Sequence, residues 1–290
     1  MTTPFIKLSK NVFLKMENMS KTLSHKERLA HKHIVNAYNM RYKNITVGSC
    51  GNYGFSILQL ANEYGINAKI FIPKSFVNDK ITYLKKYQSD NIESVDYSYE
   101  DAVRASIKYA LKKDSYYDAN CFSTHSSVSY ASYYNLSREI VEEFKSCVHS
   151  LCIWIPIGNG ITLTSIYRYF SQNNINIRYG IVGSKNNSSP IQSMKNKYPT
   201  RLNQYDIEPS EHNEPLVNYE IVPNTLELID ISKNNFISEI TDKNIQEAYE
   251  ILTTIGIQNI QPYGCSALAG FLQHDRNTTT KYTNVILITA

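Results

Sequence analysis

The chain has 290 residues, of which 42% are hydrophobic and 19% charged, with only 11 Gly and 9 Pro, a composition that is typical of a globular protein and excludes a largely disordered one. The formal net charge of +4 is spread along the chain, without the basic run that marks a nucleic-acid partner. Five irregularly spaced cysteines are typical of free thiols in a reducing compartment, so we expect a cytoplasmic protein.

The N-terminal stretch MTTPFIKLSKNVFLKMEN carries charges inside its apolar segments, which is not the pattern of a signal peptide. No window approaches the ~20 apolar residues that span a bilayer, so no membrane partner is expected. The stretch SKTLSHKERLA, residues 20–30, places Lys26 where a polar turn passes into the first turn of a helix. A lysine at the start of a helix normally has a solvated side chain. Any function for Lys26 must therefore be argued from other segments of the chain.

In the first half of the chain, apolar runs of strand length alternate with stretches of helical periodicity. Strands are predicted at 44–49, 68–73 and 92–98, and helices at 55–65, 77–89, 99–113 and 130–146. This alternation indicates a parallel sheet with helices on its faces.

The same rhythm begins again after residue 150. Strands are predicted at 150–158, 176–184 and 283–290, and helices at 161–173, 241–256 and 264–275. The polar, Pro-containing region 185–225 interrupts the pattern and is expected to form irregular surface structure or an edge hairpin. Two α/β lobes fit this order best.

The segment CVHSLC places Cys147, His149 and Cys152 close together, which raises the possibility of a metal site. A structural zinc site would need a further ligand pair at matching spacing, and none follows. We therefore predict no metal, and interpret Cys152 as a buried strand residue of the apolar run that follows.

Two strand-to-helix turns carry glycines where a ligand could approach the backbone: GSCGNYG, residues 48–54, and PIGNGITLTS, residues 156–165. Free N–H groups at a helix N-terminus bind anions, and glycine lets the anion come close. Neither turn has the spacing of a dinucleotide or P-loop fingerprint. Taken alone, each is more often a tight connection than a binding loop.

The segment KMENMSKTLSHKER, residues 15–28, resembles the signature K-x-E, then N-P-T-G-S-F-K-D-R, of the fold-type II pyridoxal 5'-phosphate enzymes. That family includes threonine synthase, cysteine synthase, serine/threonine dehydratases and the tryptophan synthase β chain. The matching residues are Lys15, Glu17, Thr22, Ser24, Lys26 and Arg28. The departures are Ser20 for Asn, Lys21 for Pro, Leu23 for Gly, His25 for Phe and Glu27 for Asp.

Four further segments resemble motifs of this family in the same order. SCGNYG resembles S-S-G-N-x-G, and PIGNGITLTSIYRYF resembles the phosphate loop of threonine synthase-like members. The segment ending QPYGCSALAGF resembles E-P-x-G-A-x-x-L-A, with Gln261 in place of the glutamate, and VILITA resembles V-V-x-L-T-G. Together these matches run from about residue 11 to 290.

The resemblance implies the site residues. Lys26 would form the Schiff base with pyridoxal 5'-phosphate, Asn52 would contact its 3'-oxygen and Thr289 would face its pyridine nitrogen. The implied phosphate loop consists of Gly158, Asn159, Gly160, Ile161 and Thr162. The implied substrate-carboxylate loop consists of Ser49, Cys50, Gly51, Asn52 and Tyr53.

The resemblance also implies two doubly wound α/β domains with the cofactor between them. The larger, cofactor-binding domain is predicted from residues 1–42 plus 150–290, and the smaller, carrying the carboxylate loop, from 43–149. Family members are commonly homodimers, so a homodimer is expected here.

The implied activity is β- or γ-elimination or replacement on a small amino acid through a lysine internal aldimine. Lys26 must react as the neutral amine, which burial in an apolar, cation-rich pocket favours, and once released it can take the substrate's α-proton. A neutral hydroxyl at the pyridine nitrogen makes the cofactor a weaker electron sink than a carboxylate would. By resemblance, such sites favour elimination and replacement over transamination.

Two alternatives stay open at this point. A member of the fold that has lost turnover would act as a cofactor-binding or partner-binding protein, since a fold does not guarantee activity. A nucleotide-binding α/β protein would carry nucleotide in place of pyridoxal phosphate.

Overall fold

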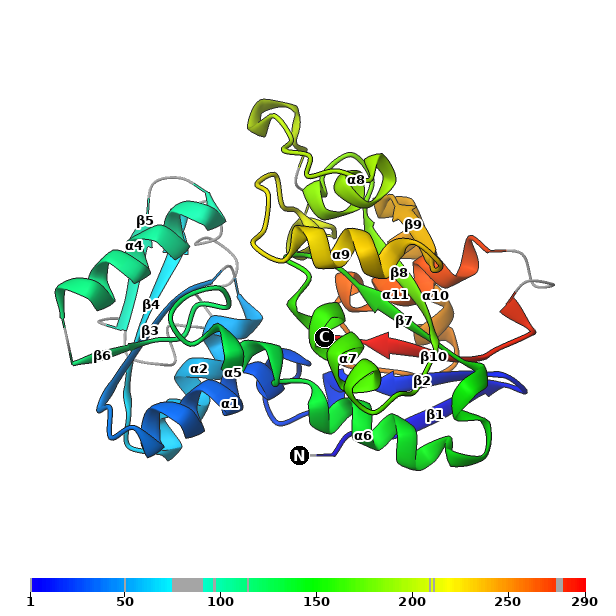
Figure 1. The fold of residues 1–290 in the computed structure, drawn as a ribbon, viewed down its shortest axis with the longest axis horizontal. Coiled ribbons are helices and arrows are strands. Elements are labelled where there is room, and N and C mark those ends of the chain that lie inside the picture. The colour runs from blue at the N-terminus through cyan, green and yellow to red at the C-terminus, as the bar shows by residue number, and fades with distance from the viewer. Residues whose placement is uncertain are drawn as a thin grey trace. The chain divides into compact units, whose positions relative to one another are not determined.

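The computed structural model describes residues 2–49, 51–74, 91–95, 98–113, 115–208, 210, 212–274 and 279–290. The chain divides into two compact units, one formed by Met1–Ser20 with Tyr133–Ala290 and the other by Lys21–Ser132 (Figure 1). Each unit has its own sheet and helices, so the predicted α/β fold with two domains is confirmed. Among the described residues, no helix is both long and apolar enough to cross a membrane.

The larger unit is built on a six-stranded sheet with the order β1-β2-β10-β7-β8-β9, in which only β1 and β2 pair antiparallel. Its strands are β1 (Phe5–Ser9), β2 (Val12–Met16), β7 (Leu151–Pro156), β8 (Arg178–Ser184), β9 (Phe236–Ile240) and β10 (Thr283–Ile288). Its helices are α6 (Tyr134–Glu143), α7 (Ile161–Gln172), α8 (Ser189–Asn196), α9 (Thr225–Ser232), α10 (Asp242–Thr254) and α11 (Ser266–Leu272). Short 3₁₀ turns are η1 (Glu17–Met19), η4 (Lys145–Ser150), η5 (Gln204–Asp206), η6 (Glu214–Leu216) and η7 (Pro262–Cys265).

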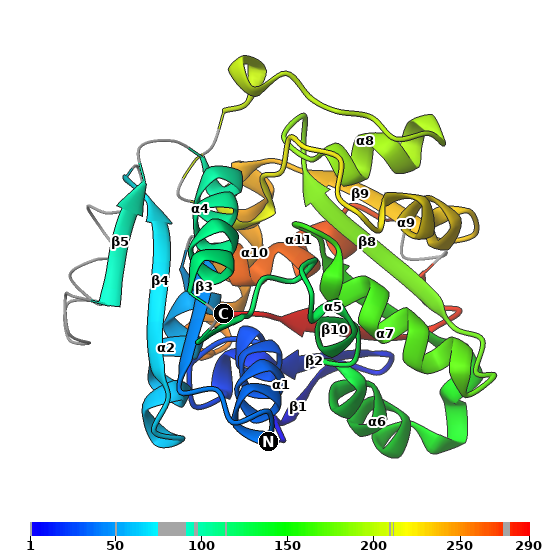
Figure 2. The same cartoon turned by 60° about the vertical axis from the view of Figure 1, so that its left-hand side comes forward.

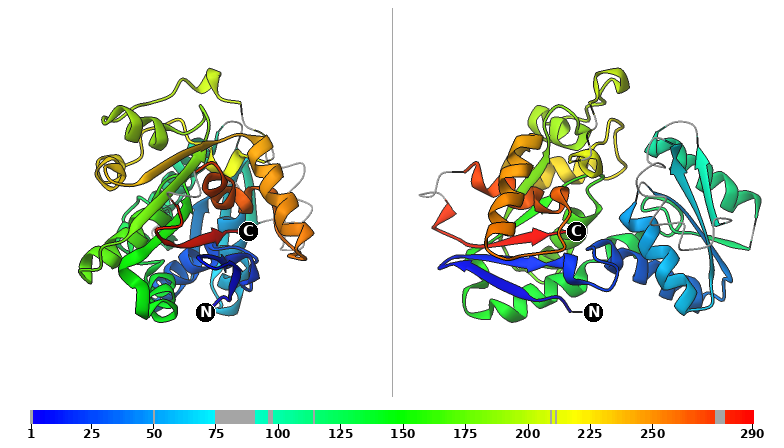
Figure 3. Two further views of the ribbon diagram at one scale, coloured as in Figure 1. Left: turned by 90° about the vertical axis from the view of Figure 1, so that its right-hand side faces the viewer. Right: turned by 180° about the vertical axis from the view of Figure 1, so that it is seen from behind.

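Both faces of this sheet are buried, as the apolar strand sequences require. Cys152 and Trp154 of β7 belong to one cluster with Leu252 of α10 and Leu268 of α11. The alternate residue Ile153 is equally buried and points to the opposite face, because side chains alternate along a strand. Figures 2 and 3 show α10 and α11 on one face of the sheet and α7 on the other. A strand buried on both sides reads as a continuous apolar run.

The smaller unit contains a fully parallel four-stranded sheet with the order β5-β4-β3-β6. Its strands are β3 (Asn44–Gly48), β4 (Asn67–Pro73), β5 (Ile92–Val95) and β6 (Tyr116–Asp118), and its helices are α1 (Lys26–Asn39), α2 (Asn52–Glu63), α4 (Tyr99–Lys112) and α5 (Ser126–Tyr130). A Cβ on Gly48 would lie 2.3 Å from the backbone of Val103 in α4, and one on Gly54 of α2 would lie 2.9 Å from Ile70 of β4. These glycines therefore let α4 and α2 pack closely on the sheet. The two helices lie on opposite faces, because Gly48 pairs with Phe71 and the side chains of Phe71 and its neighbour Ile70 point to opposite faces.

Most predicted elements agree with the structure to within a few residues, and the differences have local causes. The predicted helix 130–146 is broken between Tyr130 and Tyr134, where one unit passes into the other. Region 185–225, expected to be irregular or an edge hairpin, contains α8, which was not predicted, and its described residues include a β-bridge between Ser188 and Asn218. The strands β1, β2, β6 and β9 were not predicted either. The predicted helix 77–89 lies outside the described residues.

The boundaries of the smaller unit differ from the 43–149 predicted from the sequence. Helix α1 packs on α2 and α5, so residues from Lys21 onward lie with the smaller unit. Helix α6 packs on α7, so residues from Tyr133 onward lie with the larger one. Contacts between helices that are separated in the sequence set both boundaries. The periodicity of apolar residues does not reveal such contacts.

Candidate active site

Lys26 is the first residue of α1 and follows a loop that is held by side-chain hydrogen bonds. The Lys26 backbone N–H donates to Ser24 Oγ at 3.2 Å, and the Thr22 N–H donates to Glu27 Oε2 at 2.7 Å. The Thr22 and Ser56 hydroxyl oxygens lie 2.7 Å apart, which ties this loop to the first turns of α2. Three residues of the sequence motif therefore fix the backbone on which Lys26 sits.

Lys26 is partly buried, and this burial lowers the pKa of its ammonium group below the ordinary value of 10.5, while the nearby thiol of Cys121 opposes the shift. Burial acts in this direction because it disfavours the charged form. A larger fraction of the side chain is thus present as the free amine near neutral pH, which is the form that attacks a carbonyl.

Leu23 occupies the position where the family signature has glycine, and it keeps the backbone conformation that glycine favours, with φ of +57°. A left-handed conformation costs a residue with a Cβ about 1–2 kcal/mol. Because the side chain is 47% exposed, removing it should cost little packing.

We predict that Leu23→Gly raises the free energy of unfolding by about 0.5–1 kcal/mol, since relief of this strain outweighs the added flexibility of the unfolded chain. Denaturant unfolding measures the change. Leu23→Ala is the matched control, because it removes the side chain and keeps the Cβ; an equal gain in this variant would show that backbone strain is not the cause.

The second loop of the smaller unit joins β3 to α2. Ser49 is buried, and its Oγ accepts hydrogen bonds from the N–H groups of Gly51 at 3.3 Å and Gly54 at 2.9 Å. The Ser56 hydroxyl donates to the Asn52 carbonyl at 2.8 Å, which places this turn beside the Lys26 loop through the Thr22 contact. The first N–H groups of α2 lie here, as an anion-binding turn requires. Cys50 lies outside the described residues.

Tyr53 is directed into the smaller unit, because its hydroxyl donates to the Ala119 carbonyl at 2.6 Å and the residue is only 8% exposed. The part of Tyr53 that can serve the predicted carboxylate loop is therefore its backbone at the start of α2.

Behind these loops lies a buried polar network that the sequence did not reveal. His33 of α1 is fully buried, with Nδ1 3.1 Å from the Tyr117 hydroxyl and Nε2 2.7 Å from Ser129 Oγ. The Tyr117 ring stacks on His125 with centroids 4.1 Å apart. Burial, with a further contribution from His125, lowers the pKa of His33 to about 3 from its ordinary 6.5.

This shift makes stability depend on pH. Between pH 6.5 and 3, His33 is protonated in the unfolded chain and neutral in the folded chain. The contribution of neutral His33 to the free energy of unfolding is therefore fully present above pH 6.5 and is lost as the pH is lowered. We predict that about 2 kcal/mol of the loss between pH 7 and pH 5 comes from this residue. Denaturant titrations at both pH values should show a pH dependence smaller by that amount in His33→Gln; an unchanged dependence would contradict the assignment.

In the larger unit, the loop Gly158–Thr162 joins the carboxyl end of β7 to α7. Gly160 is the N-cap residue with φ of +82°, and Asn159 Oδ1 accepts from the Ile161 N–H at 3.2 Å. A Cβ on Gly158 would lie 2.7 Å from the Pro215 carbonyl oxygen, and one on Gly160 would lie 2.7 Å from Leu228 Cδ1. Both positions therefore require glycine, and the loop presents the N-terminus of a twelve-residue helix.

Thr289 follows β10, the neighbour of β7 in the sheet. Because the two strands are parallel, Thr289 and the Gly158–Thr162 loop both lie where the carboxyl ends of the strands meet. Thr289 is buried, and its N–H donates to the Gly264 carbonyl at 3.1 Å, while the Ala290 carbonyl accepts from the Gln261 N–H at 3.0 Å. A Cβ on Gly264 would lie 2.1 Å from that Ala290 oxygen, which explains the glycine of the QPYG segment.

The structure thus groups the predicted residues within each unit. In the smaller unit, the Lys26 loop contacts the Ser49–Tyr53 turn, and in the larger unit the Gly158–Thr162 loop shares a sheet edge with Thr289. The sequence did not indicate Cys121 beside Lys26 or Asn224 beside Gly160. For Asn224 the only signal was a Pro-Asn turn in a region expected to be irregular.

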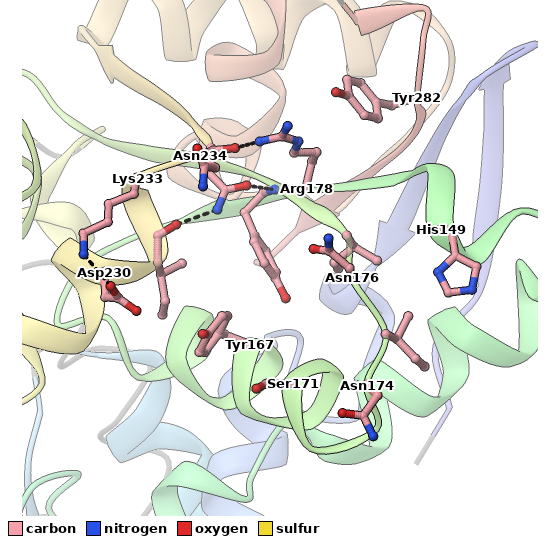
Figure 4. Close-up of a pocket in the computed structure, with 15 residues that line it drawn as sticks. His149, Tyr167, Ser171, Asn174, Asn176, Arg178, Asp230, Lys233, Asn234 and Tyr282 are labelled. Carbon is pink, nitrogen blue, oxygen red and sulfur yellow. Dashed lines mark hydrogen bonds and ion pairs between the residues drawn. The ribbon is translucent and has the colours of Figure 1, made fainter.

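A surface cavity of about 810 Å³ lies elsewhere in the larger unit (Figure 4). It is lined by Arg178 at the amino end of β8 and by Ser171 at the carboxyl end of α7, so it is at the opposite sheet edge from the glycine loop. Its charged groups pair locally: Lys233 with Asp230 at 2.7 Å, and Arg178 with the Asn234 carbonyl. We do not place the active site there.

Cys152 is fully buried in β7, as predicted, and burial raises the pKa of its thiol. Among the described residues, no group of three His, Cys, Asp or Glu side chains could hold a metal ion.

Comparison with known proteins gives one family match over nearly the whole chain: a family model described as "Pyridoxal-phosphate dependent enzyme" matches residues 2–290. The L-threonine dehydratase biosynthetic IlvA of Lactococcus lactis subsp. lactis (strain IL1403) is 25% identical over 171 residues, which are 56% of this chain and 39% of that protein. The chain therefore spans about two fifths of the length of this relative.

Two solved structures resemble the chain along its whole length. A fungal L-serine ammonia-lyase from Rhizomucor miehei has a TM-score of 0.79 and 17% identity, covering 100% of this chain and 93% of that one. The processed form of threonine deaminase isoform 2 from Solanum lycopersicum has a TM-score of 0.79 and 16% identity, covering 99% of this chain and 78% of that one. At these identities the likeness establishes the fold.

Proposed function

The chain belongs to the family of pyridoxal-phosphate dependent enzymes, and we propose that it catalyses β-elimination from a small amino acid, with serine- or threonine-type hydroxy amino acids as the first candidates. The hydroxyl leaves as water, and hydrolysis then releases ammonia and a 2-oxo acid. The L-threonine dehydratase similarity over 56% of the chain supports this choice among the reactions of the family. The proposal concerns the reaction of this chain and not every property of the relative, because the match covers only 39% of that protein.

The residues present fit pyridoxal phosphate. An aldehyde needs an amine that is not fully protonated, and burial lowers the pKa of Lys26. A phosphate needs free N–H groups, and the start of α7 offers them, because its N-cap residue, Gly160, has no side chain to cap them.

We assign the holding of the cofactor to residues of both loops and of the last strand. Lys26 would hold the aldehyde carbon, Asn52 the ring oxygen, Thr289 the pyridine nitrogen, and Gly158, Asn159, Gly160, Ile161 and Thr162 the phosphate. The backbone of Ser49, Cys50, Gly51, Asn52 and Tyr53 would receive the substrate carboxylate at the N-terminus of α2.

When bound, the cofactor acts as the electron sink that makes the substrate's α-proton acidic. The chain's own part in the reaction is then to move protons and fix orientation. The Lys26 amine takes the α-proton, and the N-terminal N–H groups of α2 fix the carboxylate so that this proton faces the amine. The observation that carries the proposal is the position of Lys26 at the start of α1, on a loop that hydrogen bonds hold beside the first turns of α2.

A hydroxyl at the ring nitrogen favours elimination over transamination in this scheme. Thr289 carries no charge that would hold a proton on the ring, so the cofactor withdraws electrons less strongly than it would beside a carboxylate. Loss of a leaving group from the carbon next to Cα would then be favoured over transfer of the amino group.

A product screen tests the reaction. The purified protein, with pyridoxal phosphate added, is incubated separately with serine, threonine, cysteine, O-acetylserine, O-phosphoserine and O-phosphohomoserine, and products are identified by mass spectrometry. We expect ammonia and the matching 2-oxo acid from serine or threonine without a second substrate. Turnover that requires an added nucleophile would instead identify a replacement reaction.

The same screen addresses the other possibilities. A visible absorption band that no amino acid alters would favour a protein that binds the cofactor without turnover. Nucleotide in the purified protein, with no pyridoxal phosphate binding, would favour a nucleotide-binding protein. The homodimer stays a prediction, which sedimentation of the purified protein tests.

A further inference from the structure

The loop that follows β6 contacts both ends of the proposed substrate-carboxylate turn, residues 49–53. At the start of the turn, Asn120 Oδ1 accepts a hydrogen bond from the Gly48 N–H at 3.0 Å. At its end, the Ala119 carbonyl accepts from the Tyr53 hydroxyl at 2.6 Å. Both loop residues are buried. Two adjacent residues, distant from the turn in sequence, therefore hold both of its ends.

The Asn120 side chain extends the pairing of β3 with β6 by one step. That pairing ends at Thr46 and Asp118, and the Ala119 N–H adds one bond to the Thr46 carbonyl at 2.9 Å. Beyond this bond the chain after β6 enters a turn, and Asn120 Oδ1 replaces a backbone carbonyl as the acceptor for the Gly48 N–H. The last N–H of β3 on this side therefore depends on one side chain.

The Asn120 amide is itself held by residues outside the carboxylate turn. Its Nδ2 donates to Asp118 Oδ1 at 2.6 Å and to the Ser106 hydroxyl of α4 at 2.8 Å. The Asn120 backbone N–H donates to the same Asp118 oxygen at 2.9 Å. Both N–H donors of the amide and its oxygen thus have partners. A buried and fully paired group of this kind is rigid, so it fixes the Gly48 N–H in place.

The position of Gly48 matters for the substrate because backbone N–H groups are the proposed ligands of the carboxylate. Ser49 follows directly, and its N–H donates to the Phe71 carbonyl of β4 at 2.9 Å. The strand end is therefore held from β6 by a side chain and from β4 by backbone. Of these two attachments, only the one through Asn120 can be removed by a substitution.

We infer that Asn120 is a positioning residue for the substrate carboxylate, which acts by holding residues 49–53 in the arrangement that binds it. This inference rests on the proposed function, because it takes that turn as the carboxylate site. Lys26 follows a loop with hydrogen bonds of its own. Loss of the Asn120 contacts should therefore weaken amino-acid binding more than it slows the chemical step.

The first test compares Asn120→Ala with the parent protein, both with pyridoxal phosphate bound, on the amino acid that the product screen identifies. We expect KM to rise about 10-fold while kcat falls by less than about threefold. The visible absorption of the bound cofactor should not change. Without substrate, hydrogen–deuterium exchange should be faster in the peptide that contains residues 48–54 and unchanged in α1.

A charge exchange tests the same contact in a second way. Asn120→Asp keeps an acceptor for the Gly48 N–H but places a second carboxylate against Asp118, and like charges at this distance repel. Adding Asp118→Asn restores an amide that donates to the carboxylate. We expect the single Asp variant to raise KM about 10-fold and the double variant to return to within about twofold of the parent. This pair decides the question if Asn120→Ala does not fold.

Ser129→Ala is the matched control. Ser129 is also a fully buried, hydrogen-bonded residue of the smaller unit, and its Oγ lies 2.7 Å from His33 Nε2. Its hydroxyl joins α5 to α1 and not to the carboxylate turn. This variant should lower the temperature of thermal unfolding and leave KM and the exchange of residues 48–54 unchanged.

The outcomes distinguish this inference from the proposed function. If the parent protein converts an amino acid and Asn120→Ala keeps the parent's KM, the inference is overturned and the proposed function stands. The inference is also overturned if Ser129→Ala raises KM as much, or if the double variant stays as impaired as Asn120→Asp, because general destabilisation would then be the cause. If the parent protein converts none of the amino acids, the proposed function fails and the inference fails with it.

Discussion

Lys26→Ala should abolish the visible absorption of the protein–cofactor complex and lower the rate of elimination by about 10³-fold or more, because the proposed function assigns both the attachment and the base to this one side chain. Lys26→Arg should fail equally, since a guanidinium stays protonated at any accessible pH and cannot attack an aldehyde. Absorption spectra and the rate of 2-oxo acid formation measure the two effects.

Lys21→Ala is the control for this experiment. Lys21 lies in the same loop, and its exposed ammonium pairs with Glu63 at 2.6 Å, a contact worth at most about 1 kcal/mol. This variant should keep both the absorption band and the rate. Full activity of Lys26→Ala would refute the assignment of the base.

The second large effect is expected at Gly160. An alanine there must adopt a φ of +82° and place its Cβ 2.7 Å from Leu228 Cδ1. We expect a loss of about 2–4 kcal/mol in the free energy of unfolding, from backbone strain and crowding together. Cofactor affinity should fall as well, since the proposed function assigns the phosphate to this loop and the substitution displaces its backbone.

Gly256 separates the two causes within the same unit. Its φ is +86°, and no atom lies within 4 Å of the position of an added Cβ. Gly256→Ala should therefore show the strain alone, about 1–2 kcal/mol, with unchanged cofactor affinity. Equal losses of affinity in both variants would mean that the Gly160 loop does not bind the cofactor.

The sequence predicted the parts of this fold that depend on local pattern. The strand predicted at 150–158 contains the fully apolar run 151–156 because both faces of β7 are buried, and the strands at 44–49 and 68–73 are rich in β-branched and apolar residues, so composition and the following turn were sufficient. Strands β1 and β2 were missed because a lysine interrupts each short apolar run, Lys7 in β1 and Lys15 in β2. The β9 strand was missed for the same reason, since Glu239 is half-buried within it.

The candidate site was predictable where a motif carried it and unpredictable where only packing did. The resemblance indicated Lys26, although Leu23 in place of glycine hid the fact that the loop keeps its left-handed turn. Cys121 and Asn224 come close to the site through tertiary packing of segments that have no motif of their own. His33 appears in sequence as one of three histidines near the start of α1, and only burial between Tyr117 and Ser129 distinguishes it.

The most direct test is to reduce the protein–cofactor complex with borohydride, digest it and locate the modified lysine by mass spectrometry. The account predicts a pyridoxyl group on the peptide that contains Lys26, and none in Lys26→Ala. A pyridoxyl group on any other lysine, or a bound cofactor that reduction does not attach to the chain, would contradict it.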